Sequence, residues 1–259
     1  MDNPEHSESE RKDLVSRESA PAFTHDEVFC LVCAAAPSGA RILDIPAGSG
    51  AFTKRLQAAN YDVVASDIVS HPALPSSLFR QADMNHSLPF EDMSFDAVVS
   101  IEGLEHIQRP FDFIRECRRI LRPGGFLALS TPNISSLRSR WRWFMTGFHN
   151  KCKYPLDETC PLPRHHINMH SFPELRYLLH TNGFRLECVR TNRVKPVNWV
   201  YLPCVPLLYP LTKMVMRKAA RTREHRRVVD ETIVQMFSTP VLFGETLIVL
   251  ARPVLPPSQ

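Results

Sequence analysis

The feature that constrains the fold most is a regular alternation, between residues 41 and 130, of short apolar segments with longer amphipathic ones. The apolar segments are continuous rather than alternating, which is typical of strands covered on both faces. They are Arg41–Ile45, Asp62–Ser66, Phe95–Ser100 and Phe126–Ser130. Ala51–Ala59 and Phe111–Leu121 between them have apolar residues at helical spacing. Short connections between such elements predict an α/β fold with a mostly parallel, doubly wound sheet.

The length of 259 residues suits one large domain with insertions. Residues 1–20 are polar and charged and are expected to form a disordered tail. We expect residues 21–259 to form a single domain, in which a further helix and two final strands follow residue 171. Residues 133–170 and 195–240 lack the regular alternation of the preceding segments, and we interpret them as substrate or lid insertions.

Composition restricts the class and the compartment. The net charge of +4 is only mildly basic, so it gives no strong reason to expect a nucleic-acid partner. Seven cysteines, an odd number, favour a reducing compartment over a disulfide scaffold. Cys30 and Cys33 lie in an apolar helical run and are expected to be buried structural thiols. The polar N-terminus and the lack of a long apolar run predict a cytoplasmic protein.

The segment Arg41-Ile-Leu-Asp-Ile-Pro-Ala-Gly-Ser-Gly50 combines a strand, a glycine-containing loop and the start of a helix. Glycines let a ligand approach the backbone, and the free N–H groups of a helix N-terminus attract anionic or polar groups. Many α/β proteins have such a loop, so it is weak evidence when taken alone.

Acidic residues occur after the second strand and again further along the chain. Asp67 ends the strand after the first helix, where a carboxylate can accept both ribose hydroxyls of an adenosine. Asp83 follows the next apolar step and is placed to accept from an adenine amino group, although an Asp there also stabilises a turn.

Taken together these motifs resemble class I S-adenosylmethionine-dependent methyltransferases. The matching runs are Leu43-Asp-Ile-Pro-Ala-Gly-Ser-Gly50, Ser66-Asp67, Ala82-Asp-Met84, Phe95-Asp-Ala-Val-Val-Ser-Ile-Glu-Gly-Leu-Glu-His106 and Leu121-Arg-Pro-Gly-Gly125. The resemblance implies a seven-stranded Rossmann-like sheet with an antiparallel last strand, helices on both faces, and S-adenosylmethionine as cofactor. It implies that the cofactor contacts the loop and the strand ends, through Asp44, Pro46, Ala47, Gly48, Gly50, Asp67, Ile68, Asp83, Met84 and Ser100.

One position departs from the family pattern, because Pro46 stands where these enzymes usually have glycine. Proline has no N–H and fixes φ. Either the loop tolerates it or cofactor affinity falls, and we favour tolerance because Gly48 and Gly50 remain. A non-catalytic cofactor-binding module is the alternative that Pro46 leaves open.

The chemistry is expected at Glu102, Glu105 and His106, after the fourth strand. Methyl transfer is an in-line displacement in which the protein positions the acceptor and, where needed, removes its proton. Glu-x-x-Glu-His resembles ubiquinone-biosynthesis O-methyltransferases and small-RNA 2′-O-methyltransferases, which implies a divalent cation held by these three residues and a later histidine, here His166. A general-base role for His106 without a metal, or a purely structural role, stays open.

The acceptor is the least determined feature. Val197–Met216 is apolar and interrupted by prolines, and the basic run Arg217–Arg227 follows it, which suits an anionic membrane surface. We therefore expect a small-molecule or lipid-linked acceptor, such as a glycan or quinone precursor, with peripheral membrane contact through residues 197–227 at the inner face of a membrane. The alternatives are a substrate lid, a homodimer contact, or an RNA methyltransferase suggested by basic residues beside aromatic ones.

Overall fold

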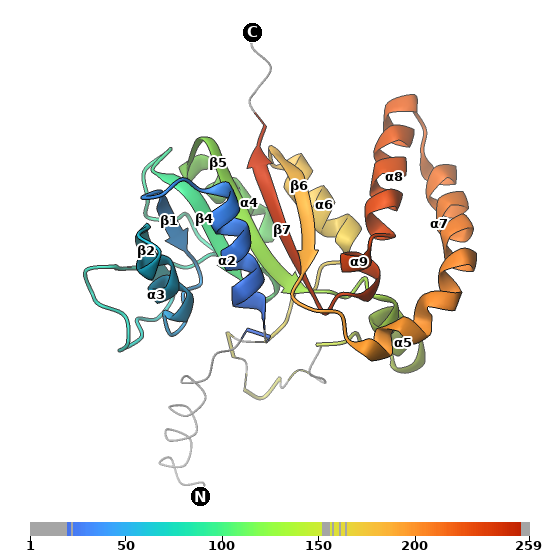
Figure 1. The fold of residues 1–259 in the computed structure, drawn as a ribbon, viewed down its shortest axis with the longest axis horizontal. Coiled ribbons are helices and arrows are strands. Elements are labelled where there is room, and N and C mark those ends of the chain that lie inside the picture. The colour runs from blue at the N-terminus through green and yellow to red at the C-terminus, as the bar shows by residue number, and fades with distance from the viewer. Residues whose placement is uncertain are drawn as a thin grey trace, which may run out of the picture.

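A computed structural model shows the fold of the chain (Figure 1). It describes residues 20–254, apart from residues 22, 152–155, 157, 161 and 164. The predicted disordered tail therefore lies almost wholly outside the described residues.

Seven strands form one sheet in the order β3-β2-β1-β4-β5-β7-β6. The strands are β1 (Arg41–Asp44), β2 (Asp62–Asp67), β3 (Phe79–Gln81), β4 (Phe95–Ile101), β5 (Leu121–Pro132), β6 (Phe184–Thr191) and β7 (Thr246–Pro253). The pairs from β3 to β5 are parallel, whereas β7 runs antiparallel to both β5 and β6. This is the mostly parallel sheet with an antiparallel last strand that the sequence predicts.

Helices cover both faces of the sheet (Figure 1). On one face, α2 (Thr24–Ala35) and α3 (Ala51–Ala58) pack their apolar residues on Ile42, Ala97 and Val99. On the other, α4 (Pro110–Ile120) and α6 (Phe172–Thr181) pack on Leu43 and Val98. Successive residues of β1 and β4 thus point into different cores, which explains why these strands read as continuous apolar runs.

Local sequence fixes the ends of the helices on the second face. Pro110 opens α4 at a position where its missing N–H is not needed, and the basic Arg118 and Arg119 lie in the last turn, where they complement the helix dipole. Ser171 and Glu174 form a capping box at the start of α6, in which the Glu174 carboxylate accepts from the Ser171 N–H at 2.7 Å.

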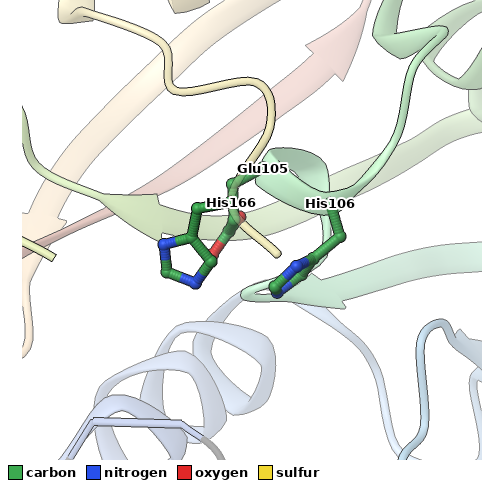
Figure 2. A group of neighbouring side chains, drawn as sticks. All are labelled: Glu105, His106 and His166. Atoms are coloured by element: carbon green, nitrogen blue, oxygen red, sulfur yellow. The ribbon is translucent and has the colours of Figure 1, made fainter. Parts of the chain in front are cut away.

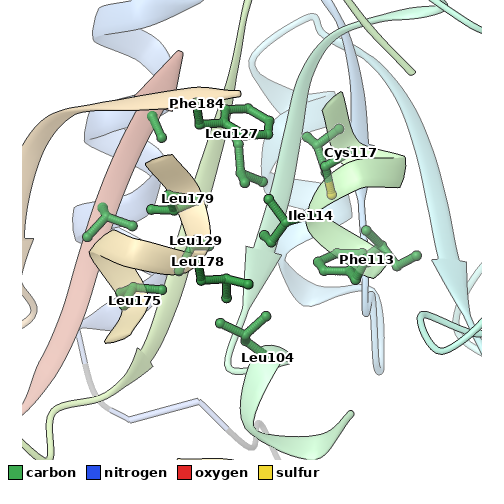
Figure 3. Close-up of a cluster of buried hydrophobic side chains, with 14 of the residues drawn as sticks. Leu104, Phe113, Ile114, Cys117, Leu127, Leu129, Leu175, Leu178, Leu179 and Phe184 are labelled. Carbon is green, nitrogen blue, oxygen red and sulfur yellow. The ribbon is translucent and has the colours of Figure 1, made fainter. Parts of the chain in front are cut away.

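The core between the sheet and these helices is dense (Figure 3). Phe113, Ile114 and Cys117 of α4 meet Leu127 and Leu129 of β5 there, and all five are 1% exposed or less. Leu175, Leu178 and Leu179 of α6 complete this layer. Such packing holds α4 and α6 against the sheet and so fixes the loops at the carboxyl ends of β4 and β5.

Two strands differ from expectation. β5 begins at Leu121, before the expected start at Phe126, because Leu121 already pairs with Phe95 before an irregularity shifts the register. β3 has only three residues, two of them exposed, so no apolar pattern marks it in the sequence.

The segments expected to be insertions lie at one end of the sheet (Figure 1). They contain α5 (Leu137–Thr146), the 3-10 segment η2 (Pro196–Cys204), α7 (Val205–Ala219) and α8 (Arg223–Met236), and α9 (Thr239–Phe243) leads back to β7. The apolar run Val197–Met216 thus forms most of η2 and α7, and the basic run Arg217–Arg227 spans the end of α7 and the start of α8. Pro206 is tolerated in the first turn of α7, and Pro210 lies inside it.

The expectation for Cys30 and Cys33 was wrong, because both are exposed. Helix α2 buries Val28, Leu31 and Val32, and residues 30 and 33 fall on its outer side. No helix in the described part of the chain is long and apolar enough to cross a bilayer.

Candidate functional site

Asp44 ends β1 and is 1% exposed. Its Oδ2 accepts from the Thr53 hydroxyl of α3 at 2.6 Å. Burial, opposed by this hydrogen bond and assisted by the charge of Asp67, raises the pKa of Asp44 to about 7. A carboxyl in this state would gain from a cationic ligand group beside it, because a nearby positive charge favours the ionised form.

The loop after β1 is tied to the end of β2. Asp67 Oδ2 accepts from the Gly48 N–H at 2.8 Å, and its Oδ1 accepts from the Ile68 N–H at 2.7 Å. Gly48 has φ +52 and open space where a Cβ would lie, so a ligand can approach the backbone here. Ile68 is 38% exposed beside Asp67 and offers an apolar surface to a flat ring.

The loop then turns into α3. Ala47 is buried, its N–H donates to the Ser66 carbonyl at 2.9 Å, and its carbonyl accepts from the Gly50 N–H at 2.9 Å. Gly50 is the N-cap of α3 with φ +77, and a Cβ there would lie 2.3 Å from the Leu74 side chain. Glycine is therefore required at Gly50 by both backbone conformation and space.

Pro46 packs against Gly103, the residue that precedes the short 3-10 segment η1 (Leu104–His106). A Cβ on Gly103 would lie 2.5 Å from Pro46 Cδ and 3.0 Å from Ser100 Oγ. The missing side chain at Gly103 therefore makes room for the Pro46 ring, which gives the chain a physical means of tolerating proline in this loop.

The Asp83 carboxylate makes hydrogen bonds within its own turn. Its Oδ1 accepts from the Asn85 N–H at 2.8 Å, and its Oδ2 lies 2.9 Å from His86 Nδ1. These bonds outweigh burial and lower the pKa of Asp83. An adenine amino group would have to compete with this turn, and the Met84 side chain beside it is 6% exposed within the main core.

The end of β4 has an unusual backbone. Glu102 has φ +48, a conformation that costs about 1–3 kcal/mol for a residue with a side chain. Its N–H donates to the carbonyl and the hydroxyl of Ser130, at 3.2 and 3.0 Å, and Ser130 donates to Glu102 Oε1 at 3.2 Å. Two strands therefore hold Glu102 in place, whereas the Ser100 hydroxyl nearby is buried without a partner among the described residues.

Glu105 is fully buried on η1. Its Oε2 accepts from the Thr131 hydroxyl at 3.2 Å, and its Oε1 has no hydrogen-bond partner among the residues that the structure describes. Burial first, and then the charge of Glu102, raise the pKa of Glu105 well above its usual range. Burial also raises the pKa of Glu102.

His106 is held in one tautomer. Its Nδ1 lies 3.1 Å from the carbonyl oxygen of His165, which can only accept, so Nδ1 carries the proton and Nε2 has a free lone pair. Burial lowers the pKa of His106, although the hydrogen bond to this carbonyl opposes the shift. A neutral imidazole with an available Nε2 can act as a base or as a metal ligand.

Figure 2 shows that Glu105, His106 and His166 point toward one another. One potential ligand atom from each lies within 4.8 Å of the other two, and the ring centroids of the two histidines are 4.8 Å apart. The structure thus brings three of the four metal candidates together. Glu102 lies outside this group, with its carboxylate on Ser130.

Several contributing residues escape sequence reasoning. Thr53, Ser130 and Thr131 hold the three acids by their hydroxyls, and hydroxyls on helices and strands give no motif. Asn168 N–H donates to the Glu105 carbonyl at 3.0 Å and docks the loop that supplies His166. A histidine-rich segment before a helix was the only signal of that loop in the sequence.

Comparisons with known proteins agree with this architecture. The methyltransferase domain family model matches residues 20–189, more than half of the chain. A ubiquinone biosynthesis O-methyltransferase of Roseobacter denitrificans is 28% identical over 56% of this chain and 64% of its own length. One from Xanthomonas oryzae pv. oryzae is 35% identical over 37% and 44% respectively. The chain thus spans less than two thirds of the length of these relatives.

Solved structures show the same fold. The 1,6-didemethyltoxoflavin-N1-methyltransferase of Burkholderia thailandensis, solved with bound 1,6-didemethyltoxoflavin and S-adenosylhomocysteine, aligns with a TM-score of 0.56 at 16% identity over 98% of this chain and 94% of that one. An S-adenosylmethionine-dependent methyltransferase of Methanosarcina mazei aligns with a TM-score of 0.51 at 20% identity over 87% and 98%.

The chain belongs to the class I S-adenosylmethionine-dependent methyltransferase family, as its sequence predicted. S-adenosylmethionine is the cofactor of that family.

The packing of Pro46 on Gly103 predicts that substitutions at these two positions have coupled effects on stability. Gly103→Ala should lower the free energy of unfolding by about 1–3 kcal/mol, because the added Cβ meets a ring that cannot rotate away. The φ of −113° at Gly103 suits alanine, so backbone strain does not explain the loss. Adding Pro46→Gly should recover most of it in urea unfolding. If Gly103→Ala costs the same stability in the wild type and in a chain that already carries Pro46→Gly, the coupling is contradicted.

Proposed function

We propose that this chain transfers the methyl group of S-adenosylmethionine to a hydroxyl oxygen of a small-molecule acceptor. The observation that carries the proposal is His106 after the carboxyl end of β4, with its Nδ1 held by the His165 carbonyl, its Nε2 available, and the buried Glu105 beside it. A base in this position suits a hydroxyl, which must lose its proton as it is methylated. The ubiquinone biosynthesis O-methyltransferases among the relatives are named for the same kind of transfer.

The cofactor would lie across the ends of β1, β2 and β4. Asp44 and the backbone of the loop from Pro46 to Gly50 would hold the methionine end, where the raised pKa of Asp44 favours the amino group of the cofactor. Asp67 and Ile68 would hold the ribose and one face of the adenine. Ser100, with its unpaired buried hydroxyl, would lie near the sulfonium. We give Asp83 and Met84 a weaker part, through the backbone of their turn.

In the proposed reaction the acceptor oxygen attacks the methyl carbon in line with the bond to sulfur. The new O–C bond forms as the S–C bond breaks, the hydroxyl proton passes to His106 Nε2, and S-adenosylhomocysteine leaves. The His165 carbonyl stabilises the resulting imidazolium through its hydrogen bond to Nδ1. Glu105, which belongs to the same group of side chains, places a negative charge beside that imidazolium when it ionises.

The alternative hypothesis is that Glu105, His106 and His166 form a divalent cation site. The unpaired, buried Oε1 of Glu105 and the close approach of His106 and His166 fit such an ion. A cation held by these three residues would lower the pKa of the acceptor hydroxyl and orient it. The two readings exclude each other at His106 Nε2, which either takes the proton or binds the ion.

Substitution of His106 tests the proposed methyl transfer. With a panel of catechols and phenols, formation of S-adenosylhomocysteine should fall by at least about a hundredfold in His106→Gln, because general-base catalysis contributes about 10²–10⁴-fold. The exposed His225→Gln on α8 should change little. His106 can act as the base only when it is neutral, and burial lowers its pKa, so protonation of His106 should reduce activity only at a pH below the usual range of histidine titration.

Removal of metal with a chelator distinguishes the general-base hypothesis from the cation-site hypothesis. Dialysis against EDTA should leave the activity unchanged if His106 is the base. Activity that EDTA removes and that Mg²⁺ or Zn²⁺ restores would assign His106 to the cation instead. Full activity of His106→Gln would reject both.

The acceptor is proposed to reach the site at an anionic membrane surface, the inner face in a cell. The apolar surface consists of exposed side chains on α5, η2 and α7: Trp141, Phe144, Met145, Val197, Val200, Leu202, Leu207, Leu211, Met214 and Val215. Neither residues 133–156 nor residues 196–223 contain an acidic residue, whereas both contain several arginines and lysines. An apolar surface whose own segments, α5, η2 and α7, carry cationic but no acidic residues suits anionic lipid better than a second copy of this chain.

Binding to lipid vesicles tests whether this apolar surface contacts a membrane. The chain should sediment with vesicles that contain phosphatidylglycerol and much less with phosphatidylcholine alone. Phe144→Ala combined with Leu207→Ala should weaken the binding at least about tenfold, since each buried side chain contributes roughly 1.5–3 kcal/mol. Val234→Ala, which removes an equally exposed side chain from α8, is the control. Self-association without vesicle binding would replace the membrane by a homodimer.

A further inference from the structure

A cavity of about 150 Å³ lies beyond the end of β5. Its walls come from the start of α5, the start of η2 and the turn before β7. The residues that matter here are Asn133, Arg138, Lys151, Lys195, Asn198 and Glu245. Neither the cofactor loop nor the cluster around His106 contributes to it.

The cavity has an excess of positive charge. Glu245 Oε1 lies 3.0 Å from the ammonium groups of both Lys151 and Lys195, and its Oε2 lies 2.5 Å from Arg193 Nε. Although burial acts in the other direction, these hydrogen bonds lower the pKa of Glu245 to about 2, so it is ionised at neutral pH. One carboxylate cannot neutralise Arg138, Lys151 and Lys195, and the walls keep two net positive charges.

These cations have donors to spare. Each ammonium group has three N–H bonds, of which Glu245 takes one. No hydrogen bond or ion pair links the Arg138 guanidinium to another residue in the described ranges. A half-buried guanidinium and two ammonium groups around one small space form a natural anion site.

Two further features of the walls point to a ligand. Helix α5 begins at this cavity with its N-cap Ser136, so the positive end of the helix dipole lies beside it. Asn198 is 4% exposed, and its amide Oδ1 is buried without a partner among the described residues. An unpaired acceptor in a cationic cavity would suit a ligand that carries a hydroxyl next to its anionic group.

The cavity adjoins the proposed reaction site. The Asn133 N–H donates to the Glu245 carbonyl at 3.2 Å, and Asn133 follows Ser130, which binds Glu102, by three residues. Lys151 and Glu245 are close enough to act on the charge of Glu102, the first lowering its pKa and the second raising it. The cavity therefore lies near the carboxyl end of β4, where the acceptor is proposed to react.

We propose that this cavity binds an anionic group, a carboxylate or a phosphate, of the methyl acceptor. The inference rests on the proposed function, because it places the acceptor hydroxyl at His106. Arg138, Lys151 and Lys195 bind the anion, and the Asn198 amide oxygen accepts from a neighbouring hydroxyl. Glu245 and Arg193 position the two lysines without contacting the ligand.

The test uses the full chain with inorganic phosphate and, separately, benzoate as probes, at constant ionic strength so that general screening stays fixed. Isothermal titration of each probe should give saturable binding. Arg138→Gln combined with Lys195→Gln should raise the Kd at least about tenfold, which is a loss of about 1.4 kcal/mol. Arg223→Gln, an exposed arginine at the start of α8, removes a charge outside the cavity and should leave the Kd unchanged.

Binding of S-adenosylhomocysteine, measured on the same proteins, separates this inference from the proposed function. Equal binding by wild type and by Arg138→Gln/Lys195→Gln shows that the double variant is folded with an intact cofactor site. Phosphate or benzoate binding lost only in the double variant supports the subsite, and the tighter probe identifies the anion. Absence of saturable binding to wild type, or equal binding by all variants, overturns the subsite even where S-adenosylhomocysteine binds. A failure of the cofactor titration alone would count against the proposed function instead.

Discussion

The pairing of β1 with both β2 and β4 is the constraint on which the site depends. The chain continues from β1 to one side and later returns to the other, so the loops after these strands diverge at their carboxyl ends and leave a place for a ligand. Asp44, Asp67 and Glu102 each end one of these strands or directly follow it. Two dense cores, one on each face of the sheet, hold the strand ends in position.

The polar groups at this edge are held by hydroxyls and backbone amides rather than by opposite charges. Thr53 binds Asp44, Ser130 binds Glu102 and Thr131 binds Glu105. Since burial outweighs these bonds, the pKa values of all three acids are raised. The edge is therefore poised to receive positive charge, which a sulfonium cofactor or a divalent cation would supply.

Sequence reasoning located most of this edge because strand ends can be read from a single chain. Apolar runs that stop at Asp44, Asp67 and Ser100 place those residues at one side of a parallel sheet, and His106 follows on the next turn. It did not find the fit of Pro46 against Gly103, which joins two loops that are far apart in the chain. Nor did it predict that Lys151, Lys195 and Glu245 meet, because long-range contacts between single charges leave no local pattern. The sequence did not predict helix α7 because the helix contains prolines, one of which its first turn accommodates.

We infer that the strand ends bind S-adenosylmethionine, and calorimetric titration of the full chain with S-adenosylhomocysteine tests this claim. We expect saturable binding at one site, weakened at least about tenfold by Asp67→Asn, which removes the carboxylate charge proposed to bind the ribose hydroxyls. Asp62→Asn, at the exposed start of the same strand, should bind as the wild type does. No heat of binding at high micromolar ligand, or equal affinities for all three proteins, would contradict the claim.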